Sequence, residues 1–216
     1  MPETEEETKL NYIDFYKKLY HPELKKRIVV TPLLKEEQIG HGIVDLRLGT
    51  EFILTKKTRF SNLNVINYDL PHNIKKYQER VIINLKDNLV LHPHQFILGS
   101  TLEYIKLPDD IMGYIIGRSS WGRLGLIIAT ATLIHPKFAG VITLELTNVG
   151  EVPINLYPGL RIAQLTLHKC KLKNLNKSDE KGKYFGSTSP NFSRIYEDSD
   201  ICLVITKKKE RNNKSP

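Results

Sequence analysis

The sequence predicts a mainly β fold, such as a sandwich, jelly roll or distorted barrel, with a short helix near the N-terminus. Short runs rich in β-branched residues recur along most of the 216 residues, and turn formers such as PDD, HPH and YPG separate them. Many short strands with frequent turns are typical of these architectures. We find no internal repeat of roughly 20–50 residues, which argues against a solenoid or a propeller.

The elements follow in chain order. Apolar residues at helical spacing predict the helix over residues 10–20. The predicted strands cover residues 27–31, 43–49, 51–55, 80–85, 95–100, 112–117, 141–147, 161–167 and 200–206. We expect an N-terminal extension and helix at 1–26, one domain over 27–205 and a basic disordered tail at 206–216. The polar, Gly/Ser-rich stretch 174–191 is a connector or a functional lid.

Composition and charge narrow the class of protein. Hydrophobic residues make up 40% of the chain and charged residues 26%, and the formal net charge is +8, which favours an anionic partner such as a nucleotide, a nucleic acid or a membrane surface. We find neither an apolar run near the ~20 residues of a membrane span nor a secretory signal at the acidic N-terminus. The two cysteines, Cys170 and Cys202, suggest a reducing compartment. We therefore expect a cytoplasmic protein that acts away from membranes.

Metal chemistry receives little support from the residue spacing. The seven histidines form no H-x-x-x-H pair, and the two cysteines form no C-x-x-C motif. The signature of zinc-dependent deaminases, H-x-E followed by P-C-x-x-C, is absent. We expect no zinc and no metal held by protein side chains.

The stretch GRSSWGRLGL, residues 117–126, combines hydroxyls with cations. Arg118 and Arg123 lie five residues apart and bracket Ser119 and Ser120. Either serine could cap a short helical turn. A turn with free N–H groups, hydroxyls and guanidiniums suits phosphate binding, but a capped turn with surface arginines fits the same residues. Composition alone leaves both interpretations open.

The stretch VITLELTN, residues 141–148, alternates in polarity. Ile142, Leu144 and Leu146 share one face of the predicted strand, whereas Thr143, Glu145 and Thr147 share the other. Glu145 is therefore either exposed to water or directed into a polar pocket. A carboxylate becomes a useful base when partial burial raises its pKa, and alternation by itself favours the exposed position.

Several stretches occur together in a familiar order. They resemble the dCTP deaminase family, within the wider trimeric dUTPase fold, over roughly residues 27–198. The resemblance rests on IVDLRLGTEF (43–52), STLEYIKLPDDIMGYIIGRSSWGRLGL (100–126), GVITLELTNVGEVPINLYPGLRIAQL (140–165) and KYFGSTSPNFSRIYED (183–198). It implies a dUTPase-like distorted β-barrel or jelly roll, assembled as a homotrimer with active sites at subunit interfaces.

The resemblance also implies an activity and roles for named residues. The activity is metal-independent hydrolytic deamination of dCTP to dUTP and ammonia, with Mg²⁺ bound through the triphosphate and dUTP or dTTP as further possible ligands. Glu145 matches the general base, and Ser119 and Arg123 match the residues that hold the attacking water and polarise the cytosine. The matching substrate-binding positions are Arg118, Ser119 and Ser120 for phosphate, Ala131, Thr132, Thr143 and Leu144 for the base, and Lys183 in a flap over residues 174–191.

Two positions depart from the family pattern and keep alternatives open. His135 stands where the family has an Asp near the deoxyribose, which argues against phosphate hydrolysis, and Ser187 stands where the flap often has Gln. A bifunctional enzyme that releases dUMP and pyrophosphate is the first alternative. A non-catalytic nucleotide-binding relative is the second. A basic nucleic-acid-binding module is the third, although we find no RNP-like or helix-turn-helix pattern.

Overall fold

The computed structural model describes residues 9–40, 42–59, 61–67, 69–129, 133–170 and 182–204. One sheet contains β1 (Val29–Thr31), β4 (Glu51–Thr55), β5 (Gln78–Ile82), β7 (Phe96–Lys106), β9 (Leu126–Ile128) and β11 (Ala139–Asn148). A second contains β2 (Ile39–Gly40), β3 (Ile43–Arg47), β8 (Ile111–Gly117), β10 (Leu133–Ile134) and β13 (Arg161–Lys169). A small ribbon pairs β6 (Leu89–Leu91) with β12 (Ile154–Leu156). The labelled helices are α1 (Tyr12–Leu19), α2 (Leu70–Tyr77) and α3 (Ser119–Gly122), with 3₁₀ turns at Leu24–Lys26, Glu36–Gln38 and Ile195–Glu197, and residues 199–204 are also helical.

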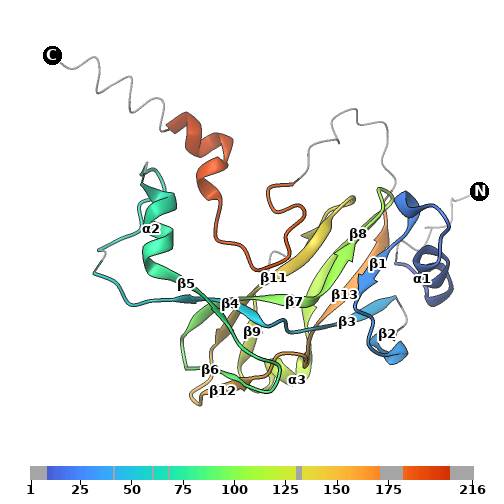
Figure 1. Ribbon diagram of the computed structural model, residues 1–216, viewed down its shortest axis with the longest axis horizontal. Coiled ribbons are helices and arrows are strands. Elements are labelled where there is room, and N and C mark those ends of the chain that lie inside the picture. The colour runs from blue at the N-terminus through green and yellow to red at the C-terminus, as the bar shows by residue number, and fades with distance from the viewer. Residues whose placement is uncertain are drawn as a thin grey trace, which may run out of the picture.

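Both main sheets are antiparallel (Figure 1). The six-stranded sheet has the order β5-β4-β7-β11-β9, with β1 also paired to β7, and the five-stranded sheet has the order β10-β8-β13-β3-β2. The prediction of a mainly β fold is confirmed, although the two sheets remain separate and do not close into a barrel.

The predicted elements compare closely with the structure, with one clear error. The helix and eight of the nine predicted strands overlap observed elements. The prediction of a strand over 200–206 is wrong, because residues 199–204 are helical and the N–H of Cys202 donates to the carbonyl of Asp198 at 3.0 Å. A short apolar run does not distinguish a strand from a helix by its pattern. The sequence analysis also missed α2 and the shortest strands.

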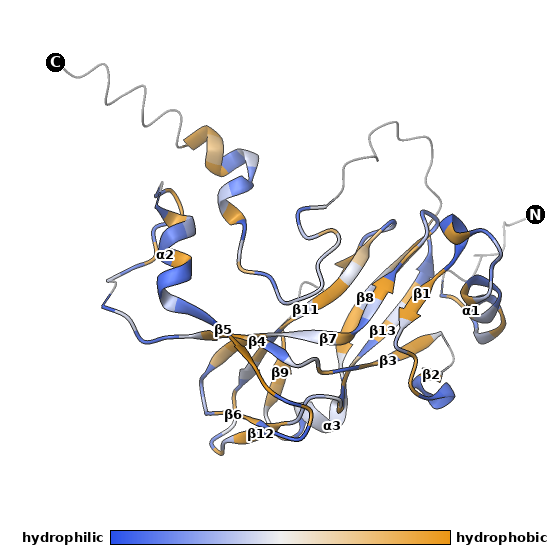
Figure 2. Cartoon of the chain, in the orientation of Figure 1, coloured by the Kyte–Doolittle hydropathy of each residue, from blue (hydrophilic) through white to orange (hydrophobic). Residues whose placement is uncertain are grey.

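The hydrophobic core lies between the two main sheets, and alternation along the strands explains it. Leu144 and Leu146 of β11 are fully buried beside Val44 and Leu46 of β3 and Leu165 of β13. Figure 2 shows hydrophobic colour alternating with white and blue along these central strands. The core-facing side of β11 is therefore the apolar side, which leaves its polar side on the outer face of the six-stranded sheet.

A carboxylate is also buried inside this core. Glu103 of β7 is completely buried, and its oxygens accept hydrogen bonds from the backbone N–H of Arg47 at 2.8 Å and the side chain of Gln38 at 2.7 Å. The Arg47 guanidinium lies 3.3 Å from the same carboxylate. Thr101 joins this region to β11, because its hydroxyl accepts from the N–H of Ile142 at 2.9 Å. A buried charge with this many partners links the two sheets.

The N-terminal segment extends the five-stranded sheet. The N–H of Leu10 donates to the carbonyl of Leu167 at 2.9 Å, and Phe15 of α1 is fully buried. Gly42 lies directly beside this segment with a positive φ of 68°, and a Cβ there would come 2.1 Å from the carbonyl oxygen of Leu10. A glycine is therefore required at residue 42 for the segment to dock.

Candidate functional site

The polar side of β11 forms the centre of the candidate site. Thr143, Glu145 and Thr147 are half-buried on the outer face of the six-stranded sheet, as their alternation with buried leucines predicts. Glu145 lies opposite Leu98 of β7, and its carbonyl accepts from the N–H of Ala129 at 2.9 Å. Leu98 is nearly buried. Glu145 therefore sits between two apolar neighbours and is only partly reached by solvent.

This partial burial changes the proton affinity of Glu145. Burial raises the pKa of the Glu145 carboxyl above its ordinary value, because a low-dielectric surrounding penalises the charged form. A carboxylate with a raised pKa takes up a proton more readily. Alternation alone could not show whether Glu145 is exposed or partly buried. The structure shows partial burial, which is the environment that a general base requires.

The edge of β11 that faces away from β7 forms backbone hydrogen bonds to two different segments near Glu145. On one side Ala129 bonds to Glu145, and further along the N–H of Val141 donates to the carbonyl of Ser187 at 2.8 Å. Thr143 lies between these two attachments, and alternate residues of a strand present their backbone N–H and C=O to the same edge. The backbone donor and acceptor of Thr143 therefore face the edge between Ala129 and Ser187.

Helix α3 holds the predicted phosphate-binding residues. The helix begins at Ser119, so Arg118 occupies the N-cap position and no side-chain capping bond forms. The expectation that Ser119 or Ser120 caps the turn is therefore wrong, because both serines lie inside the first turn. The side chain of Trp121 donates to the carbonyl of Arg161 at 2.9 Å, which packs α3 against the start of β13.

Both serines and Arg123 are exposed, and the N–H of Arg123 donates to the carbonyl of Ser119 at 3.0 Å. The hydroxyls and guanidiniums of α3 are thus available at the surface. Helix α3 connects β8 of the five-stranded sheet to β9 of the six-stranded sheet and contacts β9, whereas Glu145 belongs to β11, the strand that pairs with β9.

A network around Asp45 was missed by the sequence analysis. Asp45 of β3 is nearly buried, and its carboxylate accepts from Arg161 at 2.9 Å and from Gln164 at 2.9 Å. The Nε of Arg118 lies 4.0 Å from the same carboxylate. The available signal was a charged residue inside the apolar run IVDLRLG. The network therefore brings a carboxylate to the edge of ion-pair distance from the guanidinium of Arg118.

Two other predicted residues contribute less through their side chains. Leu144 is fully buried in the core, so only its backbone can approach a ligand. His135 is exposed in the turn before β11, where the N–H of Phe138 donates to its carbonyl at 3.2 Å. Ala131 and Thr132, predicted to contact the base, lie outside the described residues.

The C-terminal segment, defined here as residues 182–204, contains the remaining predicted residues. Lys183 forms an ion pair with Asp198 of the same segment, and this hydrogen bond raises the pKa of the lysine. The Ser187 hydroxyl donates to the carbonyl of Ser189 at 2.8 Å and accepts from the side chain of Asn191 at 2.8 Å. Both side chains are therefore engaged within the segment. The first part of the predicted flap, residues 174–181, lies outside the described residues.

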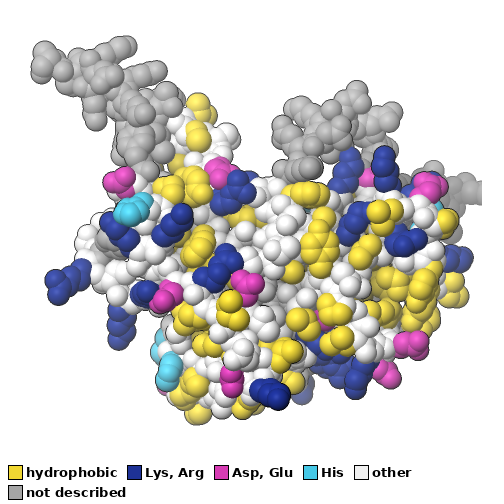
Figure 3. All heavy atoms as spheres, viewed as in Figure 1, with side chains coloured by type: hydrophobic (Ala, Val, Ile, Leu, Met, Phe, Trp, Pro, Cys, Tyr) yellow, Lys and Arg dark blue, Asp and Glu magenta, His cyan; other side chains and the backbone are white. Residues whose placement is uncertain are grey.

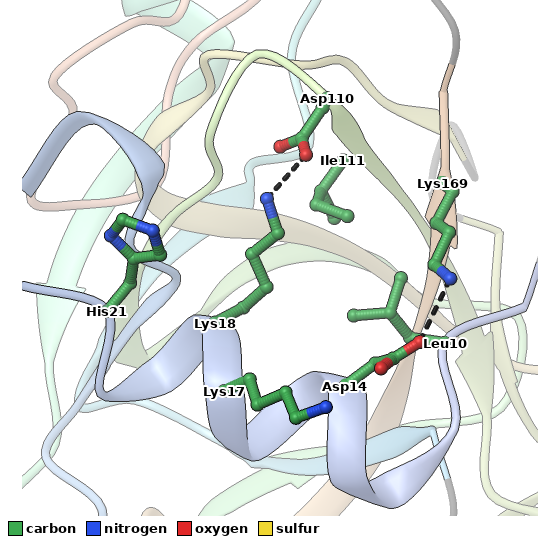
Figure 4. Close-up of a pocket in the computed structure, with 8 residues that line it drawn as sticks. All are labelled: Leu10, Asp14, Lys17, Lys18, His21, Asp110, Ile111 and Lys169. Carbon is green, nitrogen blue, oxygen red and sulfur yellow. Dashed lines mark hydrogen bonds and ion pairs between the residues drawn. The ribbon is translucent and has the colours of Figure 1, made fainter. Parts of the chain in front are cut away.

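A cavity of about 220 Å³ lies elsewhere, between α1, the start of β8 and the end of β13 (Figure 4). Lys169 pairs with Asp14 across it at 2.9 Å, and Lys18 pairs with Asp110. Its lining contains none of the predicted site residues. Among the described residues, no group of three or more His, Cys, Asp or Glu side chains is placed to hold a metal ion. The helices described here are all too short or too polar to cross a membrane.

Comparison with solved structures shows the class of fold. The chain superimposes on the 2'-deoxycytidine 5'-triphosphate deaminase of Agrobacterium tumefaciens with a TM-score of 0.57 and 18% sequence identity, over 76% of this chain and 48% of that chain. The chain thus spans about half of that protein. At this identity the likeness concerns the fold alone, and it places the two-sheet architecture in the dUTPase-like class.

Sequence comparison shows the family. The profile described as dCTP deaminase-like matches residues 17–170. A relative from Methanosphaera stadtmanae named "dCTP deaminase, dUMP-forming" is 40% identical over 81% of this chain and 89% of its own length. A relative from Haloarcula marismortui named "dCTP deaminase" is 39% identical over 81% of this chain and 90% of its own length. The chain belongs to the dCTP deaminase-like family, which confirms the resemblance drawn from its motifs.

Proposed function

We propose that this protein catalyses the hydrolytic deamination of dCTP to dUTP and ammonia. The observation that carries the proposal is Glu145, a half-buried carboxylate whose pKa burial raises, on the polar face of β11. Membership in the dCTP deaminase-like family supports the same reaction.

Glu145 acts as the general base in this proposal. Its carboxylate takes a proton from the water that attacks C4 of cytosine, and the same proton then passes toward the leaving amino group. The water oxygen first adds to C4 to give a tetrahedral intermediate. The C4–N bond then breaks as the amino group receives the proton from Glu145, the remaining hydroxyl proton moves to N3 and C4=O forms, so one water is consumed and one ammonia is released. Ser119 and Arg123 hold the water and polarise the base. Proton transfer by a positioned side chain typically contributes about 10²- to 10⁴-fold to a rate.

The triphosphate is bound by the α3 turn. Arg118, Ser119 and Ser120 supply a guanidinium and two hydroxyls at the surface, and charge-assisted bonds to phosphate are strong. Asp45 acts behind them by orienting Arg118. Mg²⁺ enters with the nucleotide and is held by its phosphate oxygens, and it is therefore part of the substrate.

The groups that contact cytosine and the C-terminal segment complete the proposed site. The backbone N–H and C=O of Thr143 face an edge of β11 where a donor and an acceptor can pair with the edge of cytosine. Leu144, Ala131 and Thr132 contribute backbone contacts, and His135 lies by the sugar. Lys183 binds phosphate after release from Asp198, and Ser187 lies beside it in the closing flap.

A second candidate product is dUMP with pyrophosphate. The Methanosphaera stadtmanae relative carries "dUMP-forming" in its name, and so does one from Persephonella marina at 39% identity. His135 argues in the opposite direction, because it replaces the negative side chain expected to assist attack on phosphorus. Pyrophosphate released beside ammonia distinguishes the two outcomes.

The direct test is to incubate purified protein with dCTP and Mg²⁺, then to separate dCTP, dUTP and dUMP by chromatography and to quantify ammonia and pyrophosphate. We expect deaminated product with the native protein and none with Glu145→Ala. Turnover equal to that of the Glu145→Ala control would reject the proposal. Tight nucleotide binding without product would instead indicate a nucleotide sensor.

We further propose that the active protein is a homotrimer in which α3 of one subunit approaches Glu145 of another. The reason is the trimeric assembly with active sites at subunit interfaces that the family resemblance implies, together with the exposure of Ser119, Ser120 and Arg123 on α3. Mixing and refolding inactive Glu145→Ala and Arg123→Ala subunits tests this arrangement. Recovered turnover in the mixture supports a shared site, whereas inactivity at every mixing ratio contradicts it.

A further inference from the structure

The C-terminal segment lies on the same subunit's six-stranded sheet. The N–H of Gly186 donates to the carbonyl of Ala139 at 2.7 Å, and the N–H of Val141 donates to the carbonyl of Ser187 at 2.8 Å. The N–H of Asn191 donates to the Thr143 hydroxyl at 3.2 Å. The segment thus begins as an added strand along β11 and then crosses the outer face at Thr143.

The far side of this face is occupied by Arg80 of β5, which binds the segment at consecutive positions. Its guanidinium donates to the Ser189 hydroxyl and, at 3.0 Å, to the carbonyl of Pro190. The same guanidinium lies 5.7 Å from the centre of the Phe192 ring, within the range of a cation–π contact. Glu51 of β4 pairs with Arg80 at 3.0 Å and fixes its position.

The strand register connects Arg80 with the candidate site. Arg80 is directly opposite Ile53, Ile53 is opposite Leu98, and Leu98 is opposite Glu145. Directly opposed residues of antiparallel strands share a face, so this row runs across the outer face from β5 to β11. Ile53 is fully buried although it faces outward. The C-terminal segment and α2 cover this part of the sheet.

Arg80 is too distant to act on Glu145 itself. Three strand spacings separate the two residues, or about 14 Å. Its contacts go instead to the segment that contains Ser187 and Asn191. Beside these contacts, a cavity of about 230 Å³ separates α2 from the segment, with Arg80, Phe192 and Arg194 in its lining. Figure 3 shows Lys and Arg side chains next to Asp and Glu side chains on this face.

We infer that Arg80 is a positioning residue that fastens the C-terminal segment across the outer face of its own six-stranded sheet, next to Glu145. One side chain binds three neighbouring residues of the segment, and Glu51 holds that side chain in place. When Arg80 is lost, the segment spends more time away from the sheet. Its effect on turnover rests on the proposed deamination, whereas the attachment itself does not.

Hydrogen exchange tests the attachment independently of activity. In Arg80→Ala, we expect the peptide that spans residues 186–192 to exchange about tenfold faster, because charge-assisted bonds to the segment are lost. Arg80→Lys should give an intermediate rate, since lysine keeps the charge without the planar fork. Arg59→Ala, which removes an exposed arginine from the loop before α2, is the matched control. Unchanged exchange in Arg80→Ala would overturn the inference.

Kinetics then test the consequence for the substrate. If only a fraction of molecules has the segment in place, the apparent affinity for nucleotide falls by that fraction. We expect KM for dCTP to rise in Arg80→Ala by less than the roughly tenfold change in exchange, because the attached fraction falls less than the opening equilibrium rises, with kcat within about threefold of the native value and partial recovery in Arg80→Lys. An unchanged KM with faster exchange would contradict the link to turnover. Failure of the native protein to deaminate dCTP would remove the proposed function but would leave the exchange result interpretable.

Discussion

Two glutamates on neighbouring strands have raised pKa values for the same physical reason, but one lies in the core and the other on the outer face of the sheet. Burial raises the pKa of both Glu103 on β7 and Glu145 on β11. Glu103 lies in the core and is surrounded by Arg47, Gln38 and a backbone N–H. Glu145 lies half-buried on the outer face, opposite Leu98 and hydrogen-bonded through its carbonyl to Ala129.

The difference shows why a perturbed pKa does not by itself identify a catalytic residue. Structural ion-pair networks perturb pKa values as strongly as active sites do. Glu103 has its hydrogen-bonding capacity used by fixed donors, so it holds the two sheets together. Burial alone accounts for the raised pKa of Glu145, which lies half-buried on the outer face and is the residue we propose as the base.

Truncation of the core carboxylate should produce the largest effect. Glu103→Ala leaves the buried guanidinium of Arg47 unpaired, and breaking a buried pair typically costs about 3–5 kcal/mol. We expect the free energy of unfolding, measured by urea denaturation, to fall by about this amount. The control is Glu145→Ala, which should change stability by about 0.5 kcal/mol or less. Equal stability losses at the two positions would remove the contrast between them.

Neutralising the Glu145 carboxylate should lower catalytic activity without lowering stability. Glu145→Gln keeps the side-chain volume but cannot accept the proton, so we expect kcat for dCTP deamination to fall about 10²- to 10⁴-fold. Thermal unfolding should remain at the native temperature. Activity within a factor of ten of the native protein would show that another group is the base.

A smaller effect is expected at the carboxylate behind Arg118. Asp45→Asn keeps an acceptor for Gln164 but removes the charge that attracts Arg161 and Arg118. We expect KM for dCTP to rise about three- to tenfold with little change in kcat, because partly exposed ion pairs are weak. Steady-state kinetics at several salt concentrations measure this change. A fall in kcat alone would indicate that Asp45 acts on the chemical step.

The smallest and most specific change concerns pH. Since burial raises the pKa of Glu145, kcat/KM should fall as pH is lowered through a pKa above that of an exposed glutamate. Leu98→Thr puts a polar side chain opposite Glu145 and should move this acid limb to lower pH. A pH profile of the native protein and the variant provides the measurement. Identical acid limbs would show that Leu98 does not control the ionisation.

Much of the fold could be predicted because strand formation depends on local pattern. The alternation around Glu145 correctly assigned the buried and outer faces of β11, and eight predicted strands overlap observed ones. The error at residues 200–206 arose because a short apolar run satisfies both a strand and a helix. The helix α2 was missed because its apolar positions are few and it contacts the sheet through only part of its surface.

The sequence by itself determined the family, the β class and the residues expected to perform the chemistry, since these depend on motifs and on periodicity within short stretches. Only the tertiary structure decided the surroundings of these side chains. Glu145 lies opposite Leu98 of another strand, Arg118 lies 4.0 Å from Asp45 of β3, and Arg80 of β5 donates a hydrogen bond to Pro190 of the C-terminal segment. Solvation and charge at a site are set by neighbours in space, and residues far apart in the chain become neighbours only when it folds.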